Sequence, residues 1–134
     1  MKTNILTLLS LFFILFGCKS QSKEFTLIGK WQLKETISGN GGGKKYHSNI
    51  TNGRTFEFKS NGEVINELGK KGKYQLEDEN SEGTFLKLIF PNSEVEYFNL
   101  HSEENDTEKI TLNPINSERQ LICDCGCSEI YEKE

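Results

Sequence analysis

Short runs in which apolar and polar residues alternate fill most of the chain after residue 24. In the first run, Trp31, Leu33 and Ile37 alternate with polar neighbours, which is typical of an antiparallel strand with one buried face. Glu35 interrupts its apolar side. The chain has about eight such runs in all, at intervals of roughly 8–12 residues and separated by turn-forming residues. They lie within residues 30–37, 54–59, 64–68, 73–77, 85–90, 94–99, 109–112 and 121–133.

The connections between these runs indicate that consecutive strands pair. Asn61-Gly62 is the strongest hairpin signal, because both residues readily adopt the positive φ values of a tight turn. Only residues 38–53, which include Gly41-Gly42-Gly43, form a long connection; we expect a loop that covers a barrel mouth or lies freely on the surface. The pattern predicts an all-β fold, a small up-and-down antiparallel β-barrel of about eight strands. Residues 25–28 are expected to form a single helical turn that closes one end.

The amino-terminal segment has the pattern of a targeting signal. Lys2 precedes an apolar stretch over residues 5–16, which is shorter than the ~20 residues of a membrane-spanning helix. The ending Leu15-Phe16-Gly17-Cys18 resembles the bacterial lipoprotein signal. This resemblance implies a signal peptide over residues 1–17, acyl chains such as palmitate on Cys18, and a tether to residue 24, followed by the barrel domain over residues 25–134. A plain signal peptide with an incidental cysteine is the alternative.

Lipidation would place the protein in the bacterial cell envelope, anchored to the outer membrane and facing the periplasm or the cell surface. Cleavage before Cys18 removes one lysine and no acid, so the net charge changes from −4 to −5. This charge argues against a nucleic-acid partner and against a basic patch that holds anionic lipids. The expected membrane partner is therefore reached through the covalent anchor, and we expect a monomer.

Three segments together resemble the lipocalin-like lipoproteins of Bacteroidetes-type bacteria. They are Gly29-Lys30-Trp31, the hairpin 55–62 and residues 72–76. The resemblance implies that Trp31 closes one end of the barrel, where its indole N–H needs an acceptor. In lipocalins an arginine near the last strand often packs over this tryptophan, and Arg119 is the candidate here.

The same resemblance implies a small hydrophobic ligand, bound or carried inside the barrel. The expected ligand-binding residues lie near the mouth, under the 39–53 loop; they are Trp31, Phe56, Phe58, Tyr74 and Tyr97. The alternative is that these aromatic side chains fill the barrel completely. The protein would then be a structural or accessory envelope lipoprotein that acts through its outer surface.

The cysteine-rich stretch Cys123-Asp124-Cys125-Gly126-Cys127 is the most unusual part of the chain. Three cysteines remain once Cys18 is lipidated, and an oxidising compartment favours a disulfide. Cys123 and Cys127 can bridge across a turn at Gly126, which would leave Cys125 free. A thiol cluster that binds Cu(I) or Zn(II) is a less favoured alternative, because thiolates in an extended strand are too far apart to share one metal.

The sequence has no recognisable catalytic constellation. Neither His47 nor His101 has a serine or cysteine nucleophile in a recognisable setting, and both are expected on the surface. The glycines 41–43 lack the lysine and hydroxyl residue of a phosphate-binding loop. We therefore expect no enzyme activity, no metal and no cofactor.

Overall fold

The computed structural model describes residues 25–80, 83–103, 105–123 and 126–134. Predictions for residues 1–24, including the signal peptide and Cys18, lie outside these ranges. Within them no helix is long and apolar enough to cross a bilayer, and the one helical element is the short η2 turn, Pro91–Ser93. The strands are β1 (Gly29–Gly39), β2 (Lys45–Asn49), β3 (Thr55–Phe58), β4 (Glu63–Asn66), β5 (Lys71–Asn80), β6 (Gly83–Phe90), β7 (Glu94–Glu103), β8 (Asp106–Ile115) and β9 (Cys127–Lys133).

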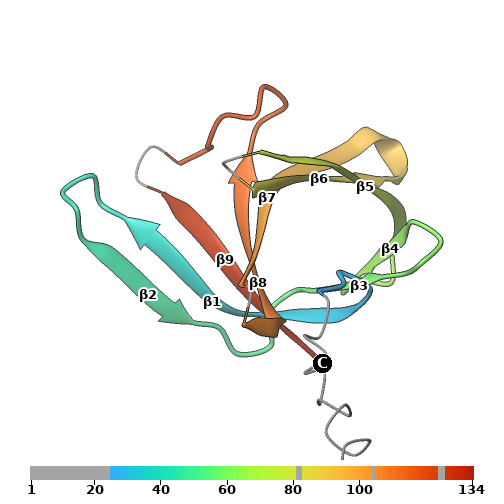
Figure 1. The fold of residues 1–134 in the computed structure, drawn as a ribbon, viewed down its shortest axis with the longest axis horizontal. Coiled ribbons are helices and arrows are strands. Elements are labelled where there is room, and N and C mark those ends of the chain that lie inside the picture. Colours follow the sequence, from blue (N-terminus) through green and yellow to red (C-terminus); the bar gives the residue numbers. More distant parts are fainter. Residues whose placement is uncertain (1–24, 81–82, 104, 124–125) are drawn as a thin grey trace, which may run out of the picture.

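Eight of these strands close into an antiparallel barrel (Figure 1). Each strand from β3 to β9 pairs with the next one along the chain, and β9 pairs back onto β1. The predicted up-and-down β-barrel is therefore confirmed. The Asn61-Gly62 hairpin joins β3 to β4 as expected, with Gly62 at a φ of 82°.

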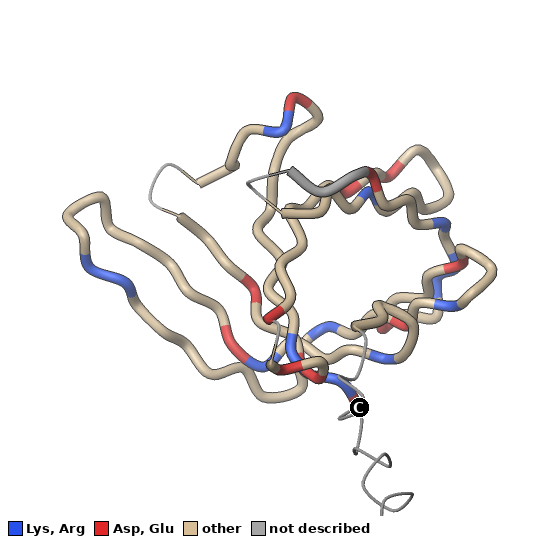
Figure 2. Tube along the Cα trace, viewed as in Figure 1, with Lys and Arg blue, Asp and Glu red and all other residues tan. Residues whose placement is uncertain are grey.

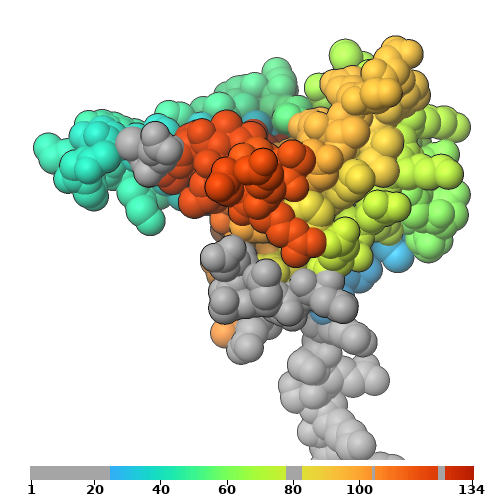
Figure 3. Space-filling model, turned by 90° about the horizontal axis from the view of Figure 1, so that it is seen from above, coloured from blue at the N-terminus to red at the C-terminus, as the bar shows by residue number. Residues whose placement is uncertain are grey.

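The ninth strand, β2, lies outside the barrel. The first part of β1 pairs with β3 through Gly29 to Gln32, whereas its last part, from Glu35 to Gly39, pairs with β2. The two strands form an arm beside the barrel, seen on the left of Figures 1 and 3. The expectation of a loop over residues 38–53 was therefore wrong for residues 45–49. Every residue of β2 is exposed, so the strand has no apolar side that the sequence pattern could reveal.

A β-bulge explains the acidic residue on the apolar side of the first strand. The register between β1 and β9 shifts between Leu33 and Glu35. Leu33 is buried in the core, whereas Glu35 is turned toward β2, where its carboxylate contacts the His47 ring. The extra residue of a bulge changes which face the following side chains occupy. Glu35 is thus an acidic residue of the arm and not of the barrel core.

The Trp31 end of the barrel is closed by the segment that precedes β1. Residues 25–28 have no regular secondary structure, so the expected helical turn does not form. Leu27 is buried instead, and its carbonyl oxygen accepts a 2.7 Å hydrogen bond from the Trp31 indole N–H. The Phe25 ring packs against Trp31 with 6.4 Å between centroids. A short irregular segment therefore supplies the acceptor that the buried indole needs.

The cation over Trp31 is a lysine of the last strand. Lys133 Nζ lies 5.1 Å from the Trp31 ring centroid, because β9 pairs with β1 at this position. Arg119, the candidate from the sequence, lies over Phe85 instead, with Cζ 4.4 Å from that ring centroid. The assignment of Arg119 was wrong because the turn that carries it folds against a different part of the barrel.

Candidate functional site

The middle of the barrel is occupied by side chains. One contiguous cluster of buried residues joins opposite walls, with Trp31, Phe56, Leu86, Leu88 and Leu112 each at 0% exposure. These residues come from β1, β3, β6 and β8, which lie around the whole circumference. An eight-stranded barrel is just wide enough for its side chains to fill it. The described core thus consists of fully buried side chains that come from all around the barrel.

Three of the five predicted ligand-binding residues, Trp31, Phe56 and Phe58, belong to this core, and Tyr74 packs against it. Phe58 lies 5.9 Å from Phe56 and meets Tyr74 edge to face at 5.1 Å, as measured between ring centroids. The Tyr74 hydroxyl donates a 2.9 Å hydrogen bond to the Lys59 carbonyl. Trp31 bonds to Leu27 as described above. These aromatic side chains are therefore engaged with one another and with the backbone.

Tyr97, the fifth predicted residue, lies on the opposite face of the sheet. Its neighbour Phe98 is part of the core, and alternation along β7 turns Tyr97 outward. Its ring lies 5.8 Å from Phe85, and Lys87 Nζ lies 5.7 Å from the Tyr97 ring centroid. Arg119 covers Phe85 and is ion-paired with Glu77. The structure thus separates Tyr97 from the other four aromatic residues.

A polar cluster lies at the barrel end from which the arm projects. Arg54 Nη2 donates a 2.7 Å hydrogen bond to Glu96, and Arg54 Cζ lies 4.4 Å from the Phe56 ring centroid. The Tyr131 hydroxyl donates a 2.8 Å hydrogen bond to Glu129. A pocket of about 190 Å³ adjoins this cluster; it is lined by Arg54, Val95, Glu96, Tyr97, Phe98, Pro114, Ile115, Ile122 and Glu129.

Burial and the neighbouring charges together set the pKa values in this cluster. Burial raises the pKa of the Tyr131 phenol, and the nearby Glu129 carboxylate raises it further, so Tyr131 stays protonated and donates to Glu129. For Arg54 burial lowers the pKa, but its interactions with Tyr131, Glu96 and Glu129 outweigh burial and raise it. Arg54 is thus a fixed positive charge held between aromatic rings and carboxylates. Its buried Nε has no hydrogen-bond partner among the described residues.

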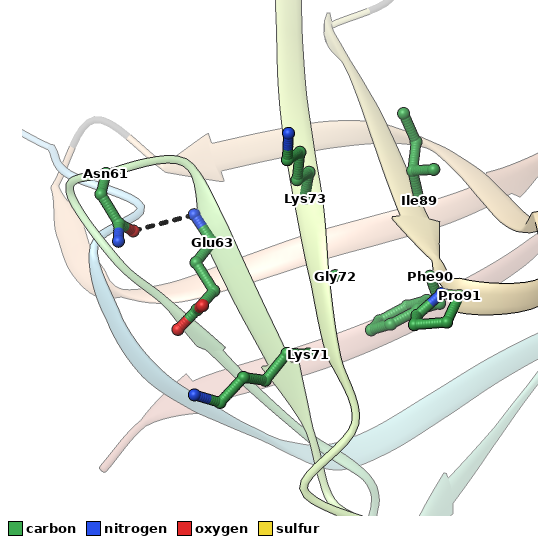
Figure 4. Close-up of a pocket in the computed structure, with 8 residues that line it drawn as sticks. All are labelled: Asn61, Glu63, Lys71, Gly72, Lys73, Ile89, Phe90 and Pro91. Atoms are coloured by element: carbon green, nitrogen blue, oxygen red, sulfur yellow. Dashed lines mark hydrogen bonds between the residues drawn. The ribbon is translucent and has the colours of Figure 1, made fainter.

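A larger groove of about 460 Å³ lies on the outer face of the barrel (Figure 4). It runs across β4, β5 and β6, and it is lined by Asn61, Glu63, Lys71, Gly72, Lys73, Ile89, Phe90 and Pro91. Asn61 Oδ1 accepts a 3.0 Å hydrogen bond from the Glu63 backbone N–H, which fixes the turn at one side of the groove. Apolar and basic side chains therefore meet on this outer face. We call this site the outer groove.

The cysteine prediction is confirmed for one pair. Cys123 and Cys127 form a disulfide with their Cα atoms 5.7 Å apart. Cys125 and Asp124 lie outside the described residues. Two of the three thiols are thus unavailable as metal ligands in this state. The described residues include no group of three or more His, Cys, Asp or Glu side chains suited to a metal ion.

Both histidines lie at the surface, as expected. His47 is on the arm, where Nδ1 contacts the Glu35 carboxylate. His101 is exposed on β7 and lines a second surface pocket, of about 420 Å³, together with Asn99, Asn113, Arg119, Gln120 and Leu121. The one strong charge in this pocket, Arg119, is already paired with Glu77.

Several residues of these sites were missed by the sequence analysis. Arg54 and Tyr131 are distant in sequence, and only closure of β9 onto β1 brings them together. Lys71 and Lys73 read as ordinary polar residues of a strand. A signal was present in the alternation of Lys71, Lys73 and Gln75, which places three polar side chains without an acid on one face.

Comparison of the chain with models of known protein families, with curated proteins and with solved structures finds no match in any of the three.

Proposed function

We propose that this protein is a lipid-anchored lipoprotein of the bacterial cell envelope that acts through its outer surface, with a filled barrel as its rigid support. The anchor is Cys18, as the sequence of residues 15–18 suggests. Several acyl chains give stable membrane attachment, whereas a single chain gives only marginal binding.

The observation that carries this proposal is the packing of the barrel centre. A carrier for an apolar guest needs an enclosed apolar space of roughly 300–1,000 Å³. The side chains that would line such a space, Phe56, Phe58 and Tyr74, contact each other at ring-centroid distances of 5.1–5.9 Å. The outer groove, of about 460 Å³, lies on the outside of the sheet and not within the barrel.

The second candidate function is binding of a small ligand at the barrel mouth. It is favoured by the pocket of about 190 Å³ beside Arg54, Glu96 and Glu129. This volume is below the usual range for drug-sized ligands, so a guest would be a small molecule held by polar groups at the rim. The barrel fold is also compatible with the hydrophobic carrier expected from the lipocalin resemblance, whose guest would need room among the aromatic side chains of the core.

Native mass spectrometry of the lipidated chain, purified from its own membranes, tests the proposal. We expect a mass equal to the acylated protein less the two hydrogens of the Cys123–Cys127 disulfide, with no guest inside the barrel. A retained apolar molecule that is lost in Phe58→Arg, while that variant stays folded, would contradict a filled barrel. The matched control is Ile65→Arg, which places the same charge on the outer face next to the buried Val64.

A further inference from the structure

We propose that the outer groove binds an organic anion that carries an apolar group, such as a phosphate or carboxylate on a hydrocarbon body. The groove combines an apolar shelf with two ammonium groups that have no acidic partner among the described residues. This inference rests on the proposed function, since it names a ligand for the outer surface.

The two lysines of the groove lack the ion pairs that neighbouring lysines form within the described residues. Lys59 pairs with Glu63 at 3.2 Å, and Lys70 pairs with Glu94. Within the described part of the chain, Lys71 and Lys73 have no carboxylate within ion-pair distance. An anion in the groove can thus pair with both lysines without breaking an existing ion pair.

Lys71 and Lys73 are two positions apart on β5, so their side chains leave the same face of the strand about 7 Å apart. Figure 4 shows Lys73 beside Ile89 and Lys71 extending toward the Glu63 side of the groove. Long flexible stems allow both ammonium groups to turn toward one anionic group. Basic positions recur along this side of the barrel, on the right of Figure 2, although the chain as a whole is acidic.

The apolar shelf of the groove is formed by Ile89 of β6 and Pro91, which begins η2. Phe90 lies beneath this shelf, because its ring is only 3% exposed and belongs to the core. Gly72 brings β5 close to this shelf. A Cβ atom at Gly72 would lie 2.5 Å from the Ile89 carbonyl oxygen and 2.7 Å from the Phe90 ring. The glycine therefore lets the Phe90 ring pack directly against the β5 backbone. The shelf and the two lysines are in this way held next to each other by the sheet.

Fluorescence titration with 1-naphthyl phosphate tests the inference directly. The protein is the lipidated full chain in nanodiscs of neutral phosphatidylcholine, and empty nanodiscs give the background. We expect saturable binding that weakens as salt is added. The double variant Lys71→Gln/Lys73→Gln should lower the affinity about tenfold. Each lysine that pairs with the anion at the surface contributes about threefold, and the two contributions multiply.

The matched control is Lys45→Gln, which removes an exposed lysine of the arm and should leave the affinity unchanged. Glu63→Gln should raise the affinity, because it removes the one carboxylate that lines the groove. Absence of saturable binding by the native chain, or equal affinity of the double variant, would overturn the inference. Neither result would bear on the filled barrel, which fails only if a guest occupies its centre.

Nanodiscs that contain phosphatidylglycerol distinguish the two sources of such an anion. If the groove takes the headgroup of an anionic lipid in its own membrane, probe affinity falls in these discs, and the fall disappears in the double lysine variant. If the groove takes a free amphiphilic anion, the probe affinity, after subtraction of the signal from empty nanodiscs, is the same in phosphatidylcholine discs and in discs that contain phosphatidylglycerol. Either outcome supports the site and identifies where its ligand comes from.

Discussion

Lys133 Nζ lies 5.1 Å from the ring centroid of Trp31, so the last strand places a cation on the tryptophan that begins the first strand. This contact depends on barrel closure, because the pairing of β1 with β9 sets Trp31 opposite Lys133. It thereby joins the two ends of the domain. A tryptophan held in this way reports on whether the barrel is closed.

Replacing Lys133 by methionine should remove the cation and keep most of the side-chain volume. A cation over an indole contributes about 0.5–1 kcal/mol at an exposed site, so the free energy of unfolding should fall by about that amount. Trp31 is the only tryptophan, and its emission spectrum should shift. Arg119→Met, which uncovers Phe85, is the control and should leave the emission unchanged. Equal shifts in both variants would show that the contact with Lys133 is not specific.

Gly29→Ala should be more destabilising than alanine at Gly43, which also has a positive φ. Gly29 has a φ of 133°, a conformation that is nearly restricted to glycine. An added Cβ would also lie 2.6 Å from Lys133 Cε and displace that side chain from Trp31. We expect a loss of about 1–3 kcal/mol in urea unfolding. Gly43→Ala, at a φ of 81° in open space, should cost less and leave the Trp31 emission unaltered.

The stability of the domain should fall at high pH through Tyr131. Burial raises the pKa of this phenol above its ordinary value of 10.0. Above that pH the unfolded chain releases the proton while the folded chain keeps it, so folding becomes less favourable by up to about 1.4 kcal/mol per pH unit. Below pH 10 both states are protonated and the effect is absent.

Tyr131→Phe isolates this effect, because it keeps the ring that stacks on Phe56 at 5.7 Å. The variant should lose about 1 kcal/mol at neutral pH, from the hydrogen bond to Glu129. Its unfolding free energy should then decline less steeply than that of the native chain above about pH 10. Tyr46→Phe, on the exposed arm, should keep the native slope. Parallel curves for Tyr131→Phe and the native chain would contradict this account.

The Arg54–Glu96 pair should show measurable coupling in a double-mutant cycle. Both side chains are less than one-third exposed, at 28% and 29%, and Arg54 is stacked on Phe56. We expect a coupling of about 1 kcal/mol between Arg54→Met and Glu96→Gln. The more exposed pair of Lys109 and Glu132, 3.8 Å apart, should give a coupling near zero. If the coupling between Arg54 and Glu96 were also near zero, their hydrogen bond would contribute little to the stability of the domain.

Much of the fold could be predicted because buried strands alternate. Phe56, Phe58 and the Asn61-Gly62 turn give a clear hairpin, and the structure contains it. The arm could not be predicted in this way, because β2 is exposed on both faces and is held by backbone pairing with β1. Its sequence therefore looks like a loop.

The candidate sites were harder to predict because they depend on register. Lys133 rather than Arg119 covers Trp31, since strand pairing fixes one contact and an irregular turn places the other residue. Tyr97 is the type of residue expected inside a barrel. It is adjacent to the core residue Phe98 on β7, however, so alternation places its side chain on the outer face of the sheet. The Arg54 cluster combines residues from β7, β9 and the segment before β3. Spacing within one strand carries no information on such a combination.

The most direct test of the filled barrel is the unfolding free energy of Val64→Phe. Val64 is completely buried in the core, so extra volume there should destabilise the domain by about 1–3 kcal/mol. Ile65→Phe, the neighbouring residue on the outer face, should change stability by less than about 0.5 kcal/mol. A barrel with an empty centre predicts the contrary, that Val64→Phe is tolerated or even stabilising. That result would return the ligand site to the interior.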